Sequence, residues 1–225
     1  MVNNYKMSLS VWLFFLYNIF MKKFPKVIPV FPLNGVIYFP KTNLPLNIFE
    51  DRYLNLVNDA YKNDKLMGMV QCNKENDNVY NVGCLGKISD YQKIKDGRIL
   101  INLTGISRFK ILKEIANNKL YREFHVDYEC FAGDMDKDLE LINDTVLMDK
   151  AKTFFKKNGL LLNWREFEKL DNTQKINTLA MIAPITNEEK QKLLEAVSLQ
   201  NKITILENII SFYLYETGTN NQTIQ

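Results

Sequence analysis

The stretch Val27–Tyr53 places apolar residues in short runs that are separated by prolines. Proline fixes φ and lacks a backbone donor, which excludes a helix, and the β-branched and aromatic residues between the prolines favour short strands. The pair Asn34-Gly35 lies between two such runs and is typical of a hairpin or tight turn. From Phe49 the apolar residues follow helical spacing, and Asn47 with Glu50 three residues later fits a helix start. We therefore expect a strand, a turn, a second strand, and then a helix that packs back on these strands.

Further strands are predicted in the apolar stretches that precede residue 133. They cover Leu66–Cys72, Val82–Ile94, Arg98–Thr104, Ser107–Leu112 and Tyr121–Phe131. Within Arg98–Thr104, Ile99, Ile101 and Leu103 are expected to face one side of the strand. Gly105 separates two of them and is expected to allow a sharp change of direction, because glycine adopts conformations closed to other residues. Short strands bent at glycine and proline predict a small closed or partly closed β-barrel.

After Gly133 the apolar residues change to helical spacing. Helices are expected around Leu139 to Phe154, Trp164 to Leu170, Ile176 to Ala183, Thr186 to Val197 and Ser198 to Tyr215. Asn158-Gly159 and Pro184 mark helix ends. Thr186 with Glu189 predicts a capping box for a helix that buries Leu193, Leu194 and Val197. The predicted fold class is therefore α+β. A barrel-like subdomain with one packed helix covers 25–133, a helical bundle covers 134–217, and a polar tail covers 218–225.

Residues 1–24 are expected to lie outside the fold. Val11–Phe20 is an apolar run that is too short to cross a bilayer as a helix. Only Lys6 is basic before it and no small-residue cleavage site follows, which argues against a signal peptide. Either translation starts at Met21, or the run is a weak anchor to a membrane surface or a partner.

The composition is that of an ordinary globular protein, with 46% apolar and 24% charged residues. The formal charge of +3 comes from dispersed basic residues, which argues against nucleic acid as a partner. Cys72, Cys84 and Cys130 are odd in number and lack CxxC spacing. This pattern argues against a disulfide framework or zinc site and favours a reducing cytoplasm, with the cysteines buried or half-buried in strands.

Motifs that carry catalysis or bind metal ions are missing from the sequence. The single histidine, His125, lies within a predicted strand and is expected to face solvent or to be hydrogen-bonded. Asp134, Asp136 and Asp138 begin like a calcium loop, but the glycine at the sixth position and the glutamate at the twelfth are missing. No phosphate-binding G-x-x-x-x-G-K-[ST] loop and no G-x-S-x-G elbow occur. We therefore expect no catalytic residue, no metal, no nucleotide and no other cofactor.

Several segments, taken in order, resemble the N-terminal, substrate-binding domain of the Lon ATP-dependent proteases. They are Pro29–Leu33, Phe39-Pro40, Pro45–Glu50, Arg52-Tyr53, Leu66–Val70, Val82–Ile88, Asp96–Arg98, Gly105–Phe109 and Lys190–Glu195. The order and spacing of these segments carry the resemblance, and Asp51 departs from it where the family often has proline. The resemblance implies a PUA-like barrel in a free-standing form without the ATPase and Ser-Lys peptidase modules of full Lon proteases.

The resemblance also implies the function: a non-enzymatic module that binds unfolded or degron-bearing polypeptides, or an adaptor of a protease or chaperone in protein quality control. Binding is expected through apolar side chains in a groove, or through an open strand edge that accepts an extended segment. We expect Phe39, Tyr53, Met67 and Met69 to line this surface. The competing interpretation places all four side chains in the core.

Glu50 and Arg108 are expected to form a structural ion pair that ties the first helix to the barrel. Glu50 lies among residues predicted to be buried, and a buried carboxylate needs a cation or several donors. Arg52 is closer in sequence, but side chains two apart on a helix point to different faces.

Two other classes of function remain open. An RNA-binding module would need its basic residues on one face, and the candidates are Lys87, Lys93, Lys95, Arg98, Arg108 and Lys110. An enzyme is disfavoured by the missing motifs.

Overall fold

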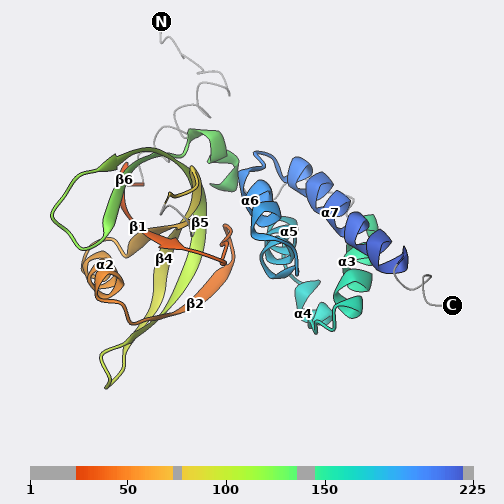
Figure 1. Ribbon diagram of the computed structural model, residues 1–225, viewed down its shortest axis with the longest axis horizontal. Helices are drawn as coiled ribbons and strands as arrows, with labels where there is room; N and C mark the ends of the chain where they lie inside the picture. Colours follow the sequence, from red (N-terminus) through yellow and green to blue (C-terminus); the bar gives the residue numbers. More distant parts are fainter. Residues whose placement is uncertain (1–23, 73–77, 136–144, 220–225) are drawn as a thin grey trace, which may run out of the picture.

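The strands form one six-stranded sheet that closes on itself (Figure 1). Its order is β2-β5-β4-β3-β1-β6, and β6 pairs in turn with β5. The strands are β1 (Val27–Leu33), β2 (Asn43–Ile48), β3 (Leu66–Gln71), β4 (Val82–Lys93), β5 (Ile99–Ile115) and β6 (Arg122–Asp127). This computed structural model describes residues 24–72, 78–135 and 145–219, so the N-terminal apolar run and most of the tail lie outside it.

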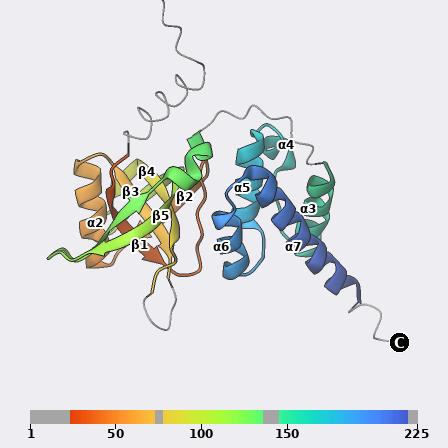
Figure 2. The same ribbon diagram turned by 90° about the horizontal axis from the view of Figure 1, so that it is seen from above.

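The helices complete an α+β fold, which confirms the predicted fold class. One helix, α2 (Asp51–Lys62), packs against β1 and β3. The short helix η1 (Glu129–Met135) follows β6 and packs against β5. The remaining helices gather on the other side of the molecule (Figures 1 and 2). They are α3 (Thr145–Lys157), α4 (Trp164–Phe167), α5 (Asn172–Ile182), α6 (Asn187–Glu195) and α7 (Leu199–Thr219).

The hairpin suggested at Asn34-Gly35 is not formed. Gly35 does adopt a left-handed conformation with φ of 85°, but the apolar run that follows it joins no strand. β1 already has a neighbour on each side, parallel β3 and antiparallel β6, so no edge is left for that run. The next strand, β2, pairs instead with β5.

The predicted helix start at Asn47 is also wrong. Asn47 lies in β2, where it pairs with Leu100 of β5. The helix begins four residues later at Asp51, and Glu50 occupies the N-cap position without a side-chain capping bond. Strand pairing therefore overrides the local capping pattern.

Gly105 does not break the strand, since β5 runs through it from Ile99 to Ile115. Its role is close packing: a Cβ atom at Gly105 would lie 2.2 Å from the carbonyl oxygen of Phe39. The backbone of Gly105 also exchanges hydrogen bonds with Lys41 and Thr42, at 3.0 and 2.9 Å. Glycine is thus required where residues 39–42 cross over β5.

Several helix signals are confirmed. Thr186 and Glu189 form the expected capping box at the start of α6. Gly159, with φ of 67°, follows α3, and Pro184 follows α5. The predicted helical residues Leu139 and Ile142 lie outside the described residues. Gly133, where we placed the boundary between subdomains, lies within η1, and the boundary itself stays a prediction.

Two burial predictions fail at the ends of elements. Val197, predicted to be buried by α6, is 63% exposed because α6 ends at Glu195. Cys130 lies exposed in η1 rather than in a strand, whereas Cys84 is buried in β4 and Cys72 is half-buried. Within the described ranges, no helix is both long enough and apolar enough to span a membrane.

Candidate functional site

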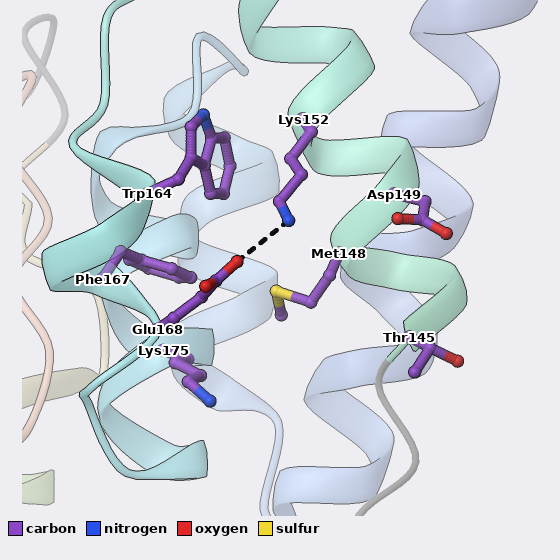
Figure 3. Close-up of a pocket in the computed structure, with 8 residues that line it drawn as sticks. All are labelled: Thr145, Met148, Asp149, Lys152, Trp164, Phe167, Glu168 and Lys175. Atoms are coloured by element: carbon purple, nitrogen blue, oxygen red, sulfur yellow. Dashed lines mark hydrogen bonds and ion pairs between the residues drawn. The ribbon is translucent and has the colours of Figure 1, made fainter.

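A groove opens between α3 on one side and α4 with the first turn of α5 on the other (Figure 3). We call it the α3–α4 groove, and its volume is about 300 Å³. Its lining residues are Thr145, Met148, Asp149, Lys152, Trp164, Phe167, Glu168 and Lys175. A hollow of this size holds a side chain or a short segment of a polypeptide.

The inner surface of the groove is apolar and rigidly held. Trp164 and Phe167 are one turn apart on α4, and their rings meet edge to face with centroids 5.4 Å apart. The Phe155 ring of α3 packs edge to face against the Trp164 ring, with the centroids 5.8 Å apart. The Asn163 side chain accepts a hydrogen bond from the backbone of Glu166 and caps α4. Phe167 is buried and Trp164 only half-buried, so the indole offers apolar surface to a ligand.

The rim of the groove carries charges of both signs. Lys152 of α3 and Glu168 beyond α4 form an ion pair across the groove, with an Nζ–Oε1 distance of 3.0 Å (Figure 3). The Lys152 ammonium also lies 5.6 Å from the centre of the Trp164 ring. Both side chains of the pair are largely exposed, so the pair is weak and can open at little cost. The groove is therefore suited to binding an apolar side chain beneath a polar rim.

A second feature is a set of polar side chains that are buried between the closed sheet and the helices. We call it the junction cluster, and it consists of Arg108, Asp134, Asn177, Gln191 and Lys202.

Each of these side chains joins one element to another. Arg108 Nη2 lies 2.7 Å from Asp134 Oδ1, which connects β5 to η1. Asn177 of α5 donates to the carbonyl of Pro40 at 2.9 Å, and Gln191 of α6 donates to the carbonyl of Val82 at 3.2 Å. The helix α5 thus contacts the sheet side through Asn177, two residues beyond Lys175 in the groove wall.

The four residues expected to line a binding surface are all buried. Met67 and Met69 lie in β3, every residue of which is buried, and they pack in one apolar cluster with Leu56 and Val57 of α2. Tyr53 belongs to the same apolar cluster, whereas Phe39 packs with the helices. Tyr53 also borders a smaller hollow of about 220 Å³ beside Glu50 and Arg52. None of the four lines the α3–α4 groove, and their contact with a substrate stays a prediction.

The predicted Glu50–Arg108 ion pair is wrong. Glu50 is exposed and pairs with Arg52 at 2.9 Å, while Arg108 is buried and pairs with Asp134. The physical reason is that Glu50 lies outside the core, at the exposed N-cap of α2, so it needs no buried partner. A side chain two residues away reaches it because Glu50 precedes the helix instead of lying within it.

The basic residues proposed for RNA do not form one accessible set. Arg108 is buried and engaged with Asp134, which removes it from any surface. Arg98 is paired with Asp96 at 2.6 Å.

Other residues considered for chemistry also have structural positions. His125 is exposed in β6. Asp134 is committed to Arg108, and the other two aspartates of the calcium-like pattern lie outside the described residues. Among the residues that the structure describes, no cluster of three or more His, Cys, Asp or Glu side chains could hold a metal ion.

Sequence reasoning did not identify the groove. It placed Trp164 and Phe167 on a short helix, which is correct, but helical spacing alone indicates burial for both. That α3 leaves Trp164 half open is a matter of how α3 and α4 pack, which no local pattern shows.

Comparisons with known proteins, by sequence and by structure, match this chain to Lon proteases and their N-terminal domains. A family model described as the ATP-dependent protease La (LON) substrate-binding domain matches residues 27–211. The Lon protease of Syntrophus aciditrophicus (strain SB) is 27% identical over 208 residues, which are 85% of this chain and 26% of that protein. The Lon protease of Malacoplasma penetrans (strain HF-2) is 29% identical over 199 residues, 79% of this chain and 24% of that protein. The chain thus spans about a quarter of the length of these relatives.

Two solved structures share the fold. The N-terminal domain of Mycobacterium avium complex Lon protease superposes with a TM-score of 0.62 at 16% identity, covering 83% of this chain and 98% of that one. The Lon N-terminal domain protein from Xanthomonas campestris gives a TM-score of 0.62 at 21% identity, covering 81% and 97%.

Proposed function

Because the chain belongs to the family of the ATP-dependent protease La (LON) substrate-binding domain, we propose that it is a recognition module that binds unfolded or degron-bearing polypeptides without itself catalysing a reaction. The α3–α4 groove is the binding site in this proposal. A protease or chaperone would act on the bound polypeptide, and the chain would serve as an adaptor in protein quality control.

The observation that supports this proposal most is the composition of the groove. Its interior is aromatic and its rim carries Lys152, Glu168, Asp149 and Lys175, two charges of each sign. An apolar side chain of a polypeptide would bury surface against Trp164, and the surrounding charges would remain in water.

The test is a fluorescence anisotropy titration with a reduced and alkylated, permanently unfolded polypeptide that carries a fluorophore. Trp164→Ala removes the aromatic wall and should weaken binding about tenfold or more, as expected for a central aromatic contact. Phe49→Ala is the matched control, because Phe49 is a 66% exposed aromatic residue that does not line the groove.

An unchanged affinity of the Trp164→Ala protein, with retained circular dichroism, would remove the groove from the proposal. Equal weakening by both substitutions would indicate unspecific apolar adsorption. The same preparation should neither bind nor hydrolyse ATP, and a saturable ATP isotherm in calorimetry would contradict a non-enzymatic role. We further propose a cytoplasmic location, which the free thiols of Cys84 and Cys130 support.

A further inference from the structure

Two helix ends of opposite polarity meet the sheet at the junction cluster. Arg108 of β5 donates to the carbonyl oxygens of Leu194 at 2.9 Å and Val197 at 3.2 Å, and also to that of Ala196. These carbonyls lie at the C-terminal end of α6, where the helix dipole is negative, so the guanidinium is well placed there.

Lys202 lies at a helix end of the opposite polarity. It lies in the first turn of α7, where the helix dipole is positive and a cation is disfavoured. Its side chain is only 2% exposed. Lys202 Nζ donates to Asn177 Oδ1 at 2.6 Å, and Asn177 in turn donates to the carbonyl of Pro40. One chain of hydrogen bonds therefore runs from α7 through α5 to the segment that crosses β5.

The charges around Lys202 do not balance when it is protonated. The groups that act on it are Arg108 from β5, Asp134 from η1 and the neutral, buried thiol of Cys84 from β4. Asp134, the single carboxylate, is already engaged by Arg108 through several hydrogen bonds. The Phe39 ring, 5.2 Å from Nζ, is the remaining favourable contact for a cation. A charged Lys202 would thus place two cations against one anion in a buried junction.

We propose that Lys202 is a pH-responsive lock between the helices and the closed sheet: the neutral amine holds α5 and α7 docked, and protonation loosens the junction. Burial first, and then the charge of Arg108, lower the pKa of Lys202 to about 7. In an undocked state the same amine would return towards its ordinary pKa of 10.5. Docking is therefore weakest below about pH 7 and strengthens as the pH rises above it.

The direct test follows the lysine side chains of the isotopically labelled full chain by NMR between pH 5.5 and 9.5. One lysine should titrate with a midpoint near 7, and its signal should be missing from the Lys202→Met protein. If every lysine of the wild-type chain stays protonated to pH 9, the proposal is refuted, whether or not the variant folds.

The second test measures amide hydrogen exchange, corrected for its intrinsic pH dependence. Protection in α5 should rise about tenfold for each pH unit between 7 and 9. Lys202→Met should abolish this pH dependence, whereas Lys192→Met, at an exposed position of α6, should retain it. A protection of α5 that does not change with pH, or an unchanged pH dependence in Lys202→Met, would overturn the proposal.

Discussion

Arg108 and Asp134, twenty-six positions apart in the sequence, form an almost fully buried ion pair, with side-chain exposures of 4% and 8%. The guanidinium donates through Nε and Nη2 to both carboxylate oxygens, and the backbone N–H of Arg108 adds a further bond to Asp134 at 2.8 Å. The same guanidinium lies 4.4 Å over the ring of Phe131. This pair attaches η1, the last described element before α3, to the sheet.

Removing either partner of this pair should therefore be costly. Arg108→Met and Asp134→Asn should each reduce the free energy of unfolding by about 3–5 kcal/mol, because the remaining charge is buried without its partner. Urea unfolding followed by circular dichroism measures the change. Asp96→Asn, at an exposed Asp96–Arg98 pair, is the control and should leave the urea midpoint nearly unchanged. Similar midpoints for all three variants would contradict the assignment.

The buried lysine should also give the global stability a pH dependence. The pKa of Lys202 is lower in the folded chain than in the unfolded one, so between about pH 7 and 10.5 the unfolded chain binds more protons. The free energy of unfolding should then rise with pH by about 1.4 kcal/mol per unit in this window.

Urea unfolding at pH 7, 8 and 9 measures this pH dependence. The quantity to compare is the difference in urea midpoint between the wild-type chain and Lys202→Met at each pH. The difference is needed because burial raises the pKa of Cys84, whose effect on stability above pH 8 has the opposite sign. A difference that stays constant with pH would show that Lys202 keeps its ordinary pKa.

Gly105→Ala should destabilise the chain by about 1–3 kcal/mol, the usual cost of overpacking a core. The added methyl group would lie 2.2 Å from a backbone oxygen, which cannot move aside like a flexible side chain. Thermal unfolding provides the measurement. Gly97→Ala is a useful comparison, since Gly97 has a φ of 92° but no atom within 4 Å of the added Cβ. Its cost is conformational alone, and a larger loss at Gly97 would argue against the close approach at Gly105.

Thr186→Ala should cost about 1 kcal/mol through loss of the capping box of α6. The Thr186 hydroxyl accepts a hydrogen bond from the backbone N–H of Glu189 at 3.2 Å. The Glu189 carboxylate in turn accepts one from the backbone N–H of Thr186 at 2.8 Å. Thr186→Ser keeps the hydroxyl and should restore most of the stability in urea unfolding. If Thr186→Ser is as unstable as Thr186→Ala, the cap is not the cause.

Sequence reasoning succeeded where structure depends on neighbours in the chain. The capping box at Thr186, the helix end at Gly159, and the buried alternation of Ile99, Ile101 and Leu103 follow from helix and strand geometry within a few residues. The α+β class and the resemblance to Lon substrate-binding domains rest on the order of such local patterns.

What only the tertiary structure decided are the contacts between distant parts of the chain. Asn34-Gly35 has the signature of a hairpin, yet β1 lies between β3 and β6, and the run after the glycine finds no free edge. Arg108 needs a buried carboxylate, but a sequence with 26 acidic residues does not show which of them the topology will bring to it. Likewise, helical spacing predicts that Trp164 is buried, whereas the packing of α3 against α4 leaves its side chain half-buried in the wall of a groove. Local patterns determine the helices and strands because these elements depend on the backbone geometry of a few neighbouring residues. Local patterns do not determine long-range pairing, because that pairing depends on which surfaces remain available once the whole fold has closed.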